Sequence, residues 1–173
     1  APWNYPFQLS IGPAVAALAA GNRVLVKPSE LAPRFAEALQ EAVATHFAPD
    51  ELAVVQGGAE LADAFARLPL DHLFFTGSPT VGRLVAQAAA ERLTPLTLEL
   101  GGKSPAILAP DCDLADAARR IAFGKLLNAG QTCVAPDYLL VPAGRADAVA
   151  DALAAAIGRL YPGLPATPDY SAI

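Results

Sequence analysis

The sequence predicts an α/β fold in which a parallel sheet, covered by helices on both faces, is followed by the start of a second α/β unit. Short apolar runs rich in branched residues recur along the chain, and most do not alternate with polar residues. This pattern is typical of strands buried on both faces. Stretches of helical length separate the runs, with short loops containing glycine or proline, as expected for strand–helix–strand units.

The first part of the chain alternates helices and strands up to residue 101. Gly21-Asn22 is a helix C-cap signal, Pro33 suits a first helical turn, and Ser78-Pro79 opens a helix. The expected helices are residues 9–20, 33–47, 59–67 and 79–92, and the expected strands are residues 23–27, 52–55, 72–76 and 96–100. Together they predict a parallel, Rossmann-like sheet.

A second set of elements follows the Gly101-Gly102 step. We expect strands at residues 106–108 and 137–142 and helices at residues 114–128 and 145–160, with Asp113 as the first N-cap. We find no internal repeat and no low-complexity linker, so the two glycines mark the domain boundary. The sequence therefore predicts one domain over residues 1–101 and the beginning of another over residues 102–173.

Composition and charge exclude several classes of function. The net charge is −5, which provides no basic surface for nucleic acid. No apolar run reaches the roughly 18 residues of a membrane span, and no signal peptide is evident. We therefore expect a cytoplasmic protein with reduced cysteines. The chain lacks Met, begins at Ala1 and has a mean hydropathy of +0.36, so we expect it to be a piece of a longer protein.

The two cysteines lie in different contexts. Cys133 follows Gly130-Gln131-Thr132 on a loop between a predicted helix and a predicted strand, where a thiol is accessible. Residue type alone also allows a small buried hydrophobe there. Cys112 lies between two aspartates, whose charge disfavours a thiolate, so we interpret it as structural. No Cys-x-x-Cys motif or histidine cluster indicates a metal site, and we expect none.

Glu99 is the charged residue of the strand Leu96-Thr97-Leu98-Glu99-Leu100. A carboxylate at this place is either paired in the core or functional, because ligands bind at the carboxyl ends of strands in open α/β sheets. Partial burial there would raise the pKa of Glu99 toward the range of a general base. The pattern alone leaves both interpretations open.

Two further loops are candidates for ligand binding. Lys27 and Glu30 bracket Pro28-Ser29 at the end of a strand. They form either a surface loop or a pair that grips hydroxyls, as an acidic residue does on a nucleotide ribose. Gly77-Ser78 joins a strand to a helix, with Gly82 one turn later, and the free N–H groups of such a turn suit a phosphate. The spacing is not G-x-G-x-x-G, so alone it is weak evidence.

Taken together, these segments resemble one enzyme family in their order and spacing. The matching motifs are Pro2-Trp3-Asn4-Tyr5-Pro6, Lys27-Pro28-Ser29-Glu30, Phe75-Thr76-Gly77-Ser78, Leu98-Glu99-Leu100-Gly101-Gly102-Lys103-Ser104-Pro105 and Gly130-Gln131-Thr132-Cys133. They cover essentially the whole chain, which resembles the aldehyde dehydrogenase superfamily. Residues 135–138 look like its class-three group, and residues 123–128 are similar to coniferyl aldehyde dehydrogenases within that group.

The resemblance implies a catalytic sequence at Cys133. This thiol attacks the aldehyde carbon to give a thiohemiacetal, whose oxyanion is held by the amide of Asn4 and the backbone N–H of Cys133. Hydride transfer to nicotinamide leaves a thioester, which a water activated by Glu99 hydrolyses to the acid. Tyr5 is expected to line the aldehyde pocket. Residues 102–173 would thus begin the catalytic domain.

The resemblance also implies a dinucleotide site in residues 1–101. Lys27 and Glu30 would bind the adenosine ribose, and Gly77, Ser78 and the helix containing Gly82 would approach the pyrophosphate. We expect NAD as cofactor with NADP tolerated, a small-molecule aldehyde as substrate, with an aromatic, coniferyl-type aldehyde as one candidate, and a homodimer for the full-length protein. The isolated piece is expected to be inactive, because the family's Glu-x-Phe-Gly-Pro motif lies beyond it. The alternatives are a non-redox thioester or ester hydrolase that uses Cys133, and a protein that retains the fold only.

Overall fold

A computed structural model describes residues 1–163; residues 164–173, the end of the second predicted domain, lie outside that part. The described strands form three two-stranded parallel sheets, β1-β2, β3-β4 and β5-β6. The α/β class and the parallel pairing predicted from the sequence are confirmed. The elements in chain order are α1 (Pro6–Ala19), β1 (Val24–Val26), α2 (Pro33–His46), β2 (Leu52–Val54), α3 (Ala59–Ala66), β3 (Leu73–Gly77), α4 (Pro79–Ala90), β4 (Leu96–Leu100), β5 (Ser104–Ile107), α5 (Leu114–Leu126), η1 (Leu127–Gly130), β6 (Pro136–Leu140) and α6 (Ala146–Leu160).

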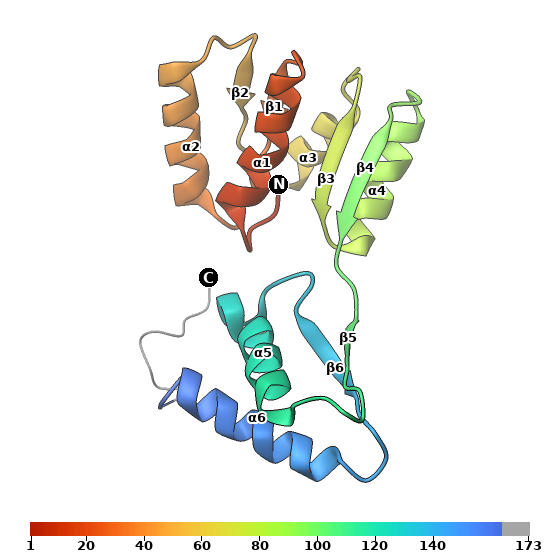
Figure 1. The fold of residues 1–173 in the computed structure, drawn as a ribbon. Helices are drawn as coiled ribbons and strands as arrows, with labels where there is room; N and C mark the ends of the chain where they lie inside the picture. Colours follow the sequence, from red (N-terminus) through yellow and green to blue (C-terminus); the bar gives the residue numbers. More distant parts are fainter. Residues whose placement is uncertain (164–173) are drawn as a thin grey trace. The chain divides into compact units, whose positions relative to one another are not determined.

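The chain divides into two compact units, Ala1–Gly101 and Gly102–Ile173. In the first unit, α1 and α2 pack on the β1-β2 pair (Figure 1). Apolar side chains from all four elements form one buried cluster, consisting of Ala14, Val26, Leu39, Val43, Leu52 and Val54. Because β1 and β2 run parallel and in register from Val24↔Leu52, their carboxyl ends lie at one edge.

In the other strand pair of the first unit, α4 packs on both β3 and β4, and α3 packs against α4 (Figure 1). The buried cluster there consists of Ala66, Leu73, Ala88 and Ala89. The register runs from Leu73↔Leu96 to Gly77↔Leu100. The carboxyl end of β3 therefore lies beside the carboxyl end of β4, where the sequence placed its candidate ligand-binding residues.

In the second unit, α5 and α6 pack through alanines, and β6 pairs with β5 (Figure 1). Ala118 and Ala122 of α5 and Ala156 of α6 are buried together, because small side chains let two helices approach closely. Asp113 caps α5 as predicted, with its side chain accepting hydrogen bonds from the backbone N–H groups of Ala115 and Asp116. In the described part of the chain, no helix is long and apolar enough to cross a membrane.

Three predicted helix boundaries were wrong by two residues or more. One is the end of α4, at Ala90 rather than at residue 92, and the other two are in α1 and α5. Helix α1 begins at Pro6 rather than at residue 9, because the fixed φ of proline suits a first helical turn. Helix α5 ends at Leu126 rather than at residue 128. There Asn128 and Ala129 adopt positive φ angles of 54° and 55°, which cannot continue a right-handed helix. The changes in α1 and α5 concern segments next to predicted catalytic residues.

Candidate active site

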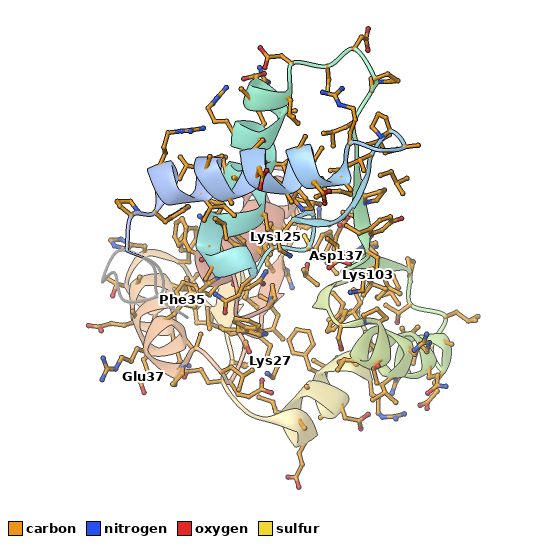
Figure 2. The ribbon with its side chains drawn as sticks, turned by 90° about the horizontal axis from the view of Figure 1, so that it is seen from below. Lys27, Phe35, Glu37, Lys103, Lys125 and Asp137 are labelled. Carbon is orange, nitrogen blue, oxygen red and sulfur yellow. The ribbon has the colours of Figure 1, made fainter. Side chains whose placement is uncertain are left out.

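Lys27 and Glu30 lie together on the loop that follows β1. The Lys27 Nζ is 3.2 Å from the Glu30 Oε2 and also donates to the Pro28 carbonyl at 3.1 Å. The Lys27 side chain is 11% exposed, whereas the Glu30 side chain is 52% exposed; Figure 2 labels Lys27 on this loop. Glu30 accepts a hydrogen bond from its own backbone N–H, which is the largest cause of a pKa below the ordinary value. The hydrogen bond from Lys27 is the second cause. The loop therefore presents an ionised, accessible carboxylate that a nearly buried cation keeps in place.

Gly77 and Ser78 form the turn between β3 and α4. The Ser78 hydroxyl accepts a hydrogen bond from the Val81 N–H at 3.3 Å and thereby caps the helix. Gly82, one turn into α4, is buried. A Cβ added to Gly82 would lie 3.0 Å from a Leu100 methyl, so this glycine lets α4 pack closely on β4. In the first turn of α4, Pro79 has no N–H and the N–H groups of Val81 and Gly82 donate to Ser78, so the Thr80 N–H is the donor that remains available to an anion.

Glu99 lies at the carboxyl end of β4, opposite Thr76 in the parallel register. Glu99, Gly77 and Ser78 therefore share one edge of the β3-β4 pair. The Thr76 hydroxyl at this edge is buried, and the described residues supply no hydrogen-bond partner for it. Glu99 itself is exposed, so the expected partial burial is wrong within this structure. Little packs over this end of β4, since even its apolar residues Leu98 and Leu100 are 38% and 36% exposed.

Asn4 and Tyr5 directly precede α1, and both are half-buried. Tyr5 is the N-cap residue of this helix, with an extended φ of −136°, and Pro6 follows in the first turn. Its carbonyl accepts the hydrogen bond of the Leu9 N–H at 3.0 Å. The start of the helix thus fixes the backbone of both residues, and their side chains belong to the first unit.

Cys133 lies at the corner of a hydrogen-bonded turn in the second unit. The Ala135 N–H donates to the Thr132 carbonyl at 3.1 Å, which makes Cys133 and Val134 the central residues of the turn. Both are exposed, and Cys133 is a free thiol. The alternative of a small buried hydrophobe is thereby excluded for Cys133 within this structure. Cys112 is also free but only half-exposed.

The segment before the turn is held in a left-handed conformation. Asn128, Ala129 and Gly130 all have positive φ angles, of 54°, 55° and 76°. The Gln131 backbone N–H and its side-chain amide both donate to the Asn128 carbonyl, each at 3.0 Å. A non-glycine residue in this region is strained, and strain of this kind persists only where surrounding bonds fix it.

We expect Gly130→Ala to destabilise the full-length protein more than Gly144→Ala. Both glycines have a φ near +75°, so each substitution has the cost of a left-handed alanine, about 1–2 kcal/mol. A Cβ at Gly130 would also lie 3.1 Å from the Lys125 carbonyl oxygen, whereas one at Gly144 meets nothing within 4 Å. Urea midpoints of the two variants measure the difference. Equal shifts would show that the Gly130 bend is not tightly packed.

The predicted site residues thus fall into two groups. Asn4, Tyr5, the Lys27–Glu30 pair and the Gly77, Ser78 and Glu99 edge belong to the first unit, and Cys133 belongs to the second. No arrangement of three or more His, Cys, Asp or Glu side chains suited to a metal occurs among the described residues. Sequence reasoning missed the ion pair between Lys103 and Asp137, at 3.0 Å. Both residues lie inside motifs quoted above, and their opposite charges were the one sign in the sequence that they could form an ion pair.

Comparison with known proteins decides the family. The model of the aldehyde dehydrogenase family matches residues 1–172. The chain belongs to the aldehyde dehydrogenase family. The resemblance stated from the motifs is therefore confirmed.

Individual relatives agree with this assignment. The chain is 54% identical over 172 residues to a probable coniferyl aldehyde dehydrogenase of Pseudomonas aeruginosa, covering 99% of this chain and 36% of that protein. It is 45% identical to aldehyde dehydrogenase family 3 member A2 of Rattus norvegicus, with the same coverage. A Mycobacterium tuberculosis aldehyde dehydrogenase complexed with NAD+ superposes with a TM-score of 0.83 and 41% identity, covering 90% of this chain and 32% of that one. The chain thus spans about a third of the length of these aldehyde dehydrogenases.

Proposed function

We propose that the full-length enzyme containing this chain oxidises an aldehyde to its carboxylic acid with NAD, through a covalent intermediate on Cys133. The observation that carries the proposal is the exposed, free thiol of Cys133 on a hydrogen-bonded turn. A thiol is the most nucleophilic side chain near neutral pH, and accessibility is its first requirement. Family membership supports the redox outcome.

The residues of the first unit fit a dinucleotide. The Glu30 carboxylate is accessible and ionised, which suits a pair of ribose hydroxyls, and Lys27 fixes its position. Gly77-Ser78 and the start of α4 fit the pyrophosphate, because the turn offers N–H donors at a helix N-terminus. The bound cofactor would accept the hydride of the substrate. A non-redox hydrolase has no use for these two loops.

The protein's own residues would then perform the remaining steps. The Cys133 sulfur attacks the aldehyde carbon to form a thiohemiacetal, and the Asn4 amide and the Cys133 N–H donate hydrogen bonds to its oxyanion. Loss of hydride leaves a thioester on Cys133. Glu99 takes a proton from a water that attacks this thioester, and the acid and the free thiol are released. The exposure of Glu99 at a strand end makes its carboxylate accessible to water.

Two finer assignments belong to the same proposal. An aromatic, coniferyl-type aldehyde is the preferred substrate, with Tyr5 lining its pocket; the relatives named as coniferyl aldehyde dehydrogenases support this. A reduced Cys133 requires a reducing compartment, and we therefore place the enzyme in the cytoplasm. Comparing kcat/KM for coniferyl aldehyde and octanal tests the substrate assignment. A clear preference for octanal would contradict it.

The choice between NAD and NADP is expected to depend on Glu30. A carboxylate repels the 2′-phosphate of NADP: two unit charges 4 Å apart repel by about 4 kcal/mol at an effective dielectric of 20 and by about 1 kcal/mol in water. NAD should therefore be preferred, and Lys27 should allow weaker use of NADP. Glu30→Gln keeps the shape but removes the charge, so it should raise the NADP-to-NAD ratio of kcat/KM by about tenfold, equivalent to 1.4 kcal/mol.

Steady-state kinetics with both cofactors on the full-length enzyme measure this ratio. Glu41→Gln is the matched control, because Glu41 is an exposed glutamate on α2, outside the loop that carries Lys27 and Glu30. The pKa of Glu30 is lowered in the folded protein, so the carboxylate is ionised near neutral pH, and its repulsion of the 2′-phosphate should be lost only as the pH falls through that lowered pKa. An unchanged ratio in Glu30→Gln would show that Glu30 does not contact the ribose.

A further inference from the structure

Strands β5 and β6 pair directly after the Cys133 turn, and the first residues of this pairing lack some of the usual backbone N–H donors. Strands β5 and β6 each contain a proline there, Pro105 and Pro136, and neither has an N–H to donate. The register steps from Ser104↔Pro136 to Pro105↔Tyr138, so Asp137 has no partner opposite it. Such an irregularity redirects a side chain and weakens pairing locally. The ladder is regular from Ala106↔Leu139 onward, so it is at the irregular start that another interaction is needed to hold the two strands in register.

The Lys103–Asp137 ion pair lies at this irregularity. The Lys103 Nζ is 3.0 Å from the Asp137 Oδ2, and Figure 2 shows the two labelled side chains next to one another. The Lys103 side chain is 80% exposed and that of Asp137 is 32% exposed. An exposed pair of this kind contributes little to overall stability. Its effect is therefore local: it ties the residue before β5 to the unpaired residue of β6.

We propose that Lys103 and Asp137 are positioning residues that fix the register of β5 on β6 and thereby hold the turn that presents Cys133. The turn closes at Ala135, directly before Pro136, so a shift of β6 moves the nucleophile. This inference rests on the proposed role of Cys133.

The test uses the full-length enzyme with Asp137→Asn, Lys103→Gln and the double substitution. Two quantities are measured: the rate of Cys133 alkylation by iodoacetamide, with Cys112 as the internal reference, and kcat and KM with NAD and aldehyde. We expect each single variant to lower alkylation and kcat by about two- to fivefold, which is the range that the loss of an exposed ion pair allows. The KM for NAD and the melting temperature should stay near those of the wild type. The double variant should be no worse than either single variant, because both remove one interaction.

Two controls separate positioning from a general structural effect. Lys103→Arg retains the cation and should behave as wild type. Asp63→Asn breaks an exposed ion pair with Arg67 on α3 and should leave alkylation and kcat unchanged. If Asp137→Asn does not fold, Lys103→Gln, at an 80% exposed side chain, still reports on the pair.

Three results would overturn the proposal. The first is that both single variants keep the alkylation rate and kcat of the wild type. The second is that Asp137→Asn lowers these two quantities whereas Lys103→Gln does not. The third is that Cys133 loses reactivity only in variants whose melting temperature also falls. Failure of the proposed function would be distinguished from failure of this proposal. If the wild-type enzyme oxidises no aldehyde, the alkylation rates still measure whether the ion pair controls the thiol.

Discussion

Cys133→Ser is expected to abolish aldehyde oxidation by the full-length enzyme. A serine hydroxyl at the same turn is not ionised near neutral pH, so the covalent step loses its nucleophile. Removing a catalytic nucleophile lowers kcat by roughly 10⁴-fold or more. NADH formation followed by absorbance measures the loss. Binding of NAD should be unchanged, since Lys27, Glu30, Gly77 and Ser78 belong to the other unit.

Cys112→Ser is the matched control for this substitution. Cys112 is the other free cysteine of the chain and is only half-exposed. It lies between Asp111 and Asp113, and Asp113 is the N-cap of α5. Its replacement should leave kcat close to that of the wild type. Activity that survives in Cys133→Ser but is lost in Cys112→Ser would exchange the roles assigned to the two thiols.

Glu99→Gln is expected to separate the two halves of the reaction. The amide cannot take a proton from water, so thioester hydrolysis should slow by roughly 10²-fold or more, within the range of general base catalysis. Attack by Cys133 and hydride transfer do not need that base. Stopped-flow mixing should therefore show a burst of NADH, of about one equivalent per active site, followed by slow turnover.

The control for the base is again Glu41→Gln, at an exposed position on α2. It should show wild-type turnover. Loss of the burst in Glu99→Gln, with NAD and aldehyde still bound, would mean that Glu99 acts before the thioester forms. That outcome would assign it to deprotonation of Cys133 instead of to activation of water.

Much of the fold was predictable because the signals are local. Apolar runs between Gly21, Pro33 and Ser78-Pro79 placed the strands and helices of the first unit near their observed bounds. The nucleophile loop was less predictable. Three successive left-handed residues at 128–130 include Asn128 and Ala129, and no sequence rule predicts alanine in that conformation. The end of α5 was therefore placed too late.

The geometry of the site depended on pairings that sequence patterns do not specify. Lys27 and Glu30 were expected to act together because one short loop carries both, and the ion pair is present. Lys103 and Asp137 are far apart in the sequence, and only the parallel pairing of β5 with β6 brings them together. The exposure of Glu99 was missed for a similar reason, since burial depends on what packs over a strand and not on its own residues.

In the proposed mechanism the substrate is bound covalently to Cys133 during oxidation. This bond can be detected directly. Full-length Glu99→Gln is mixed with aldehyde and NAD, quenched in acid within the burst, and digested for peptide mass spectrometry. A covalent intermediate predicts the mass of the acyl group on the peptide that contains Cys133, in an amount equal to the NADH formed. NADH formed without any acyl adduct, or with the adduct on Cys112, would contradict it.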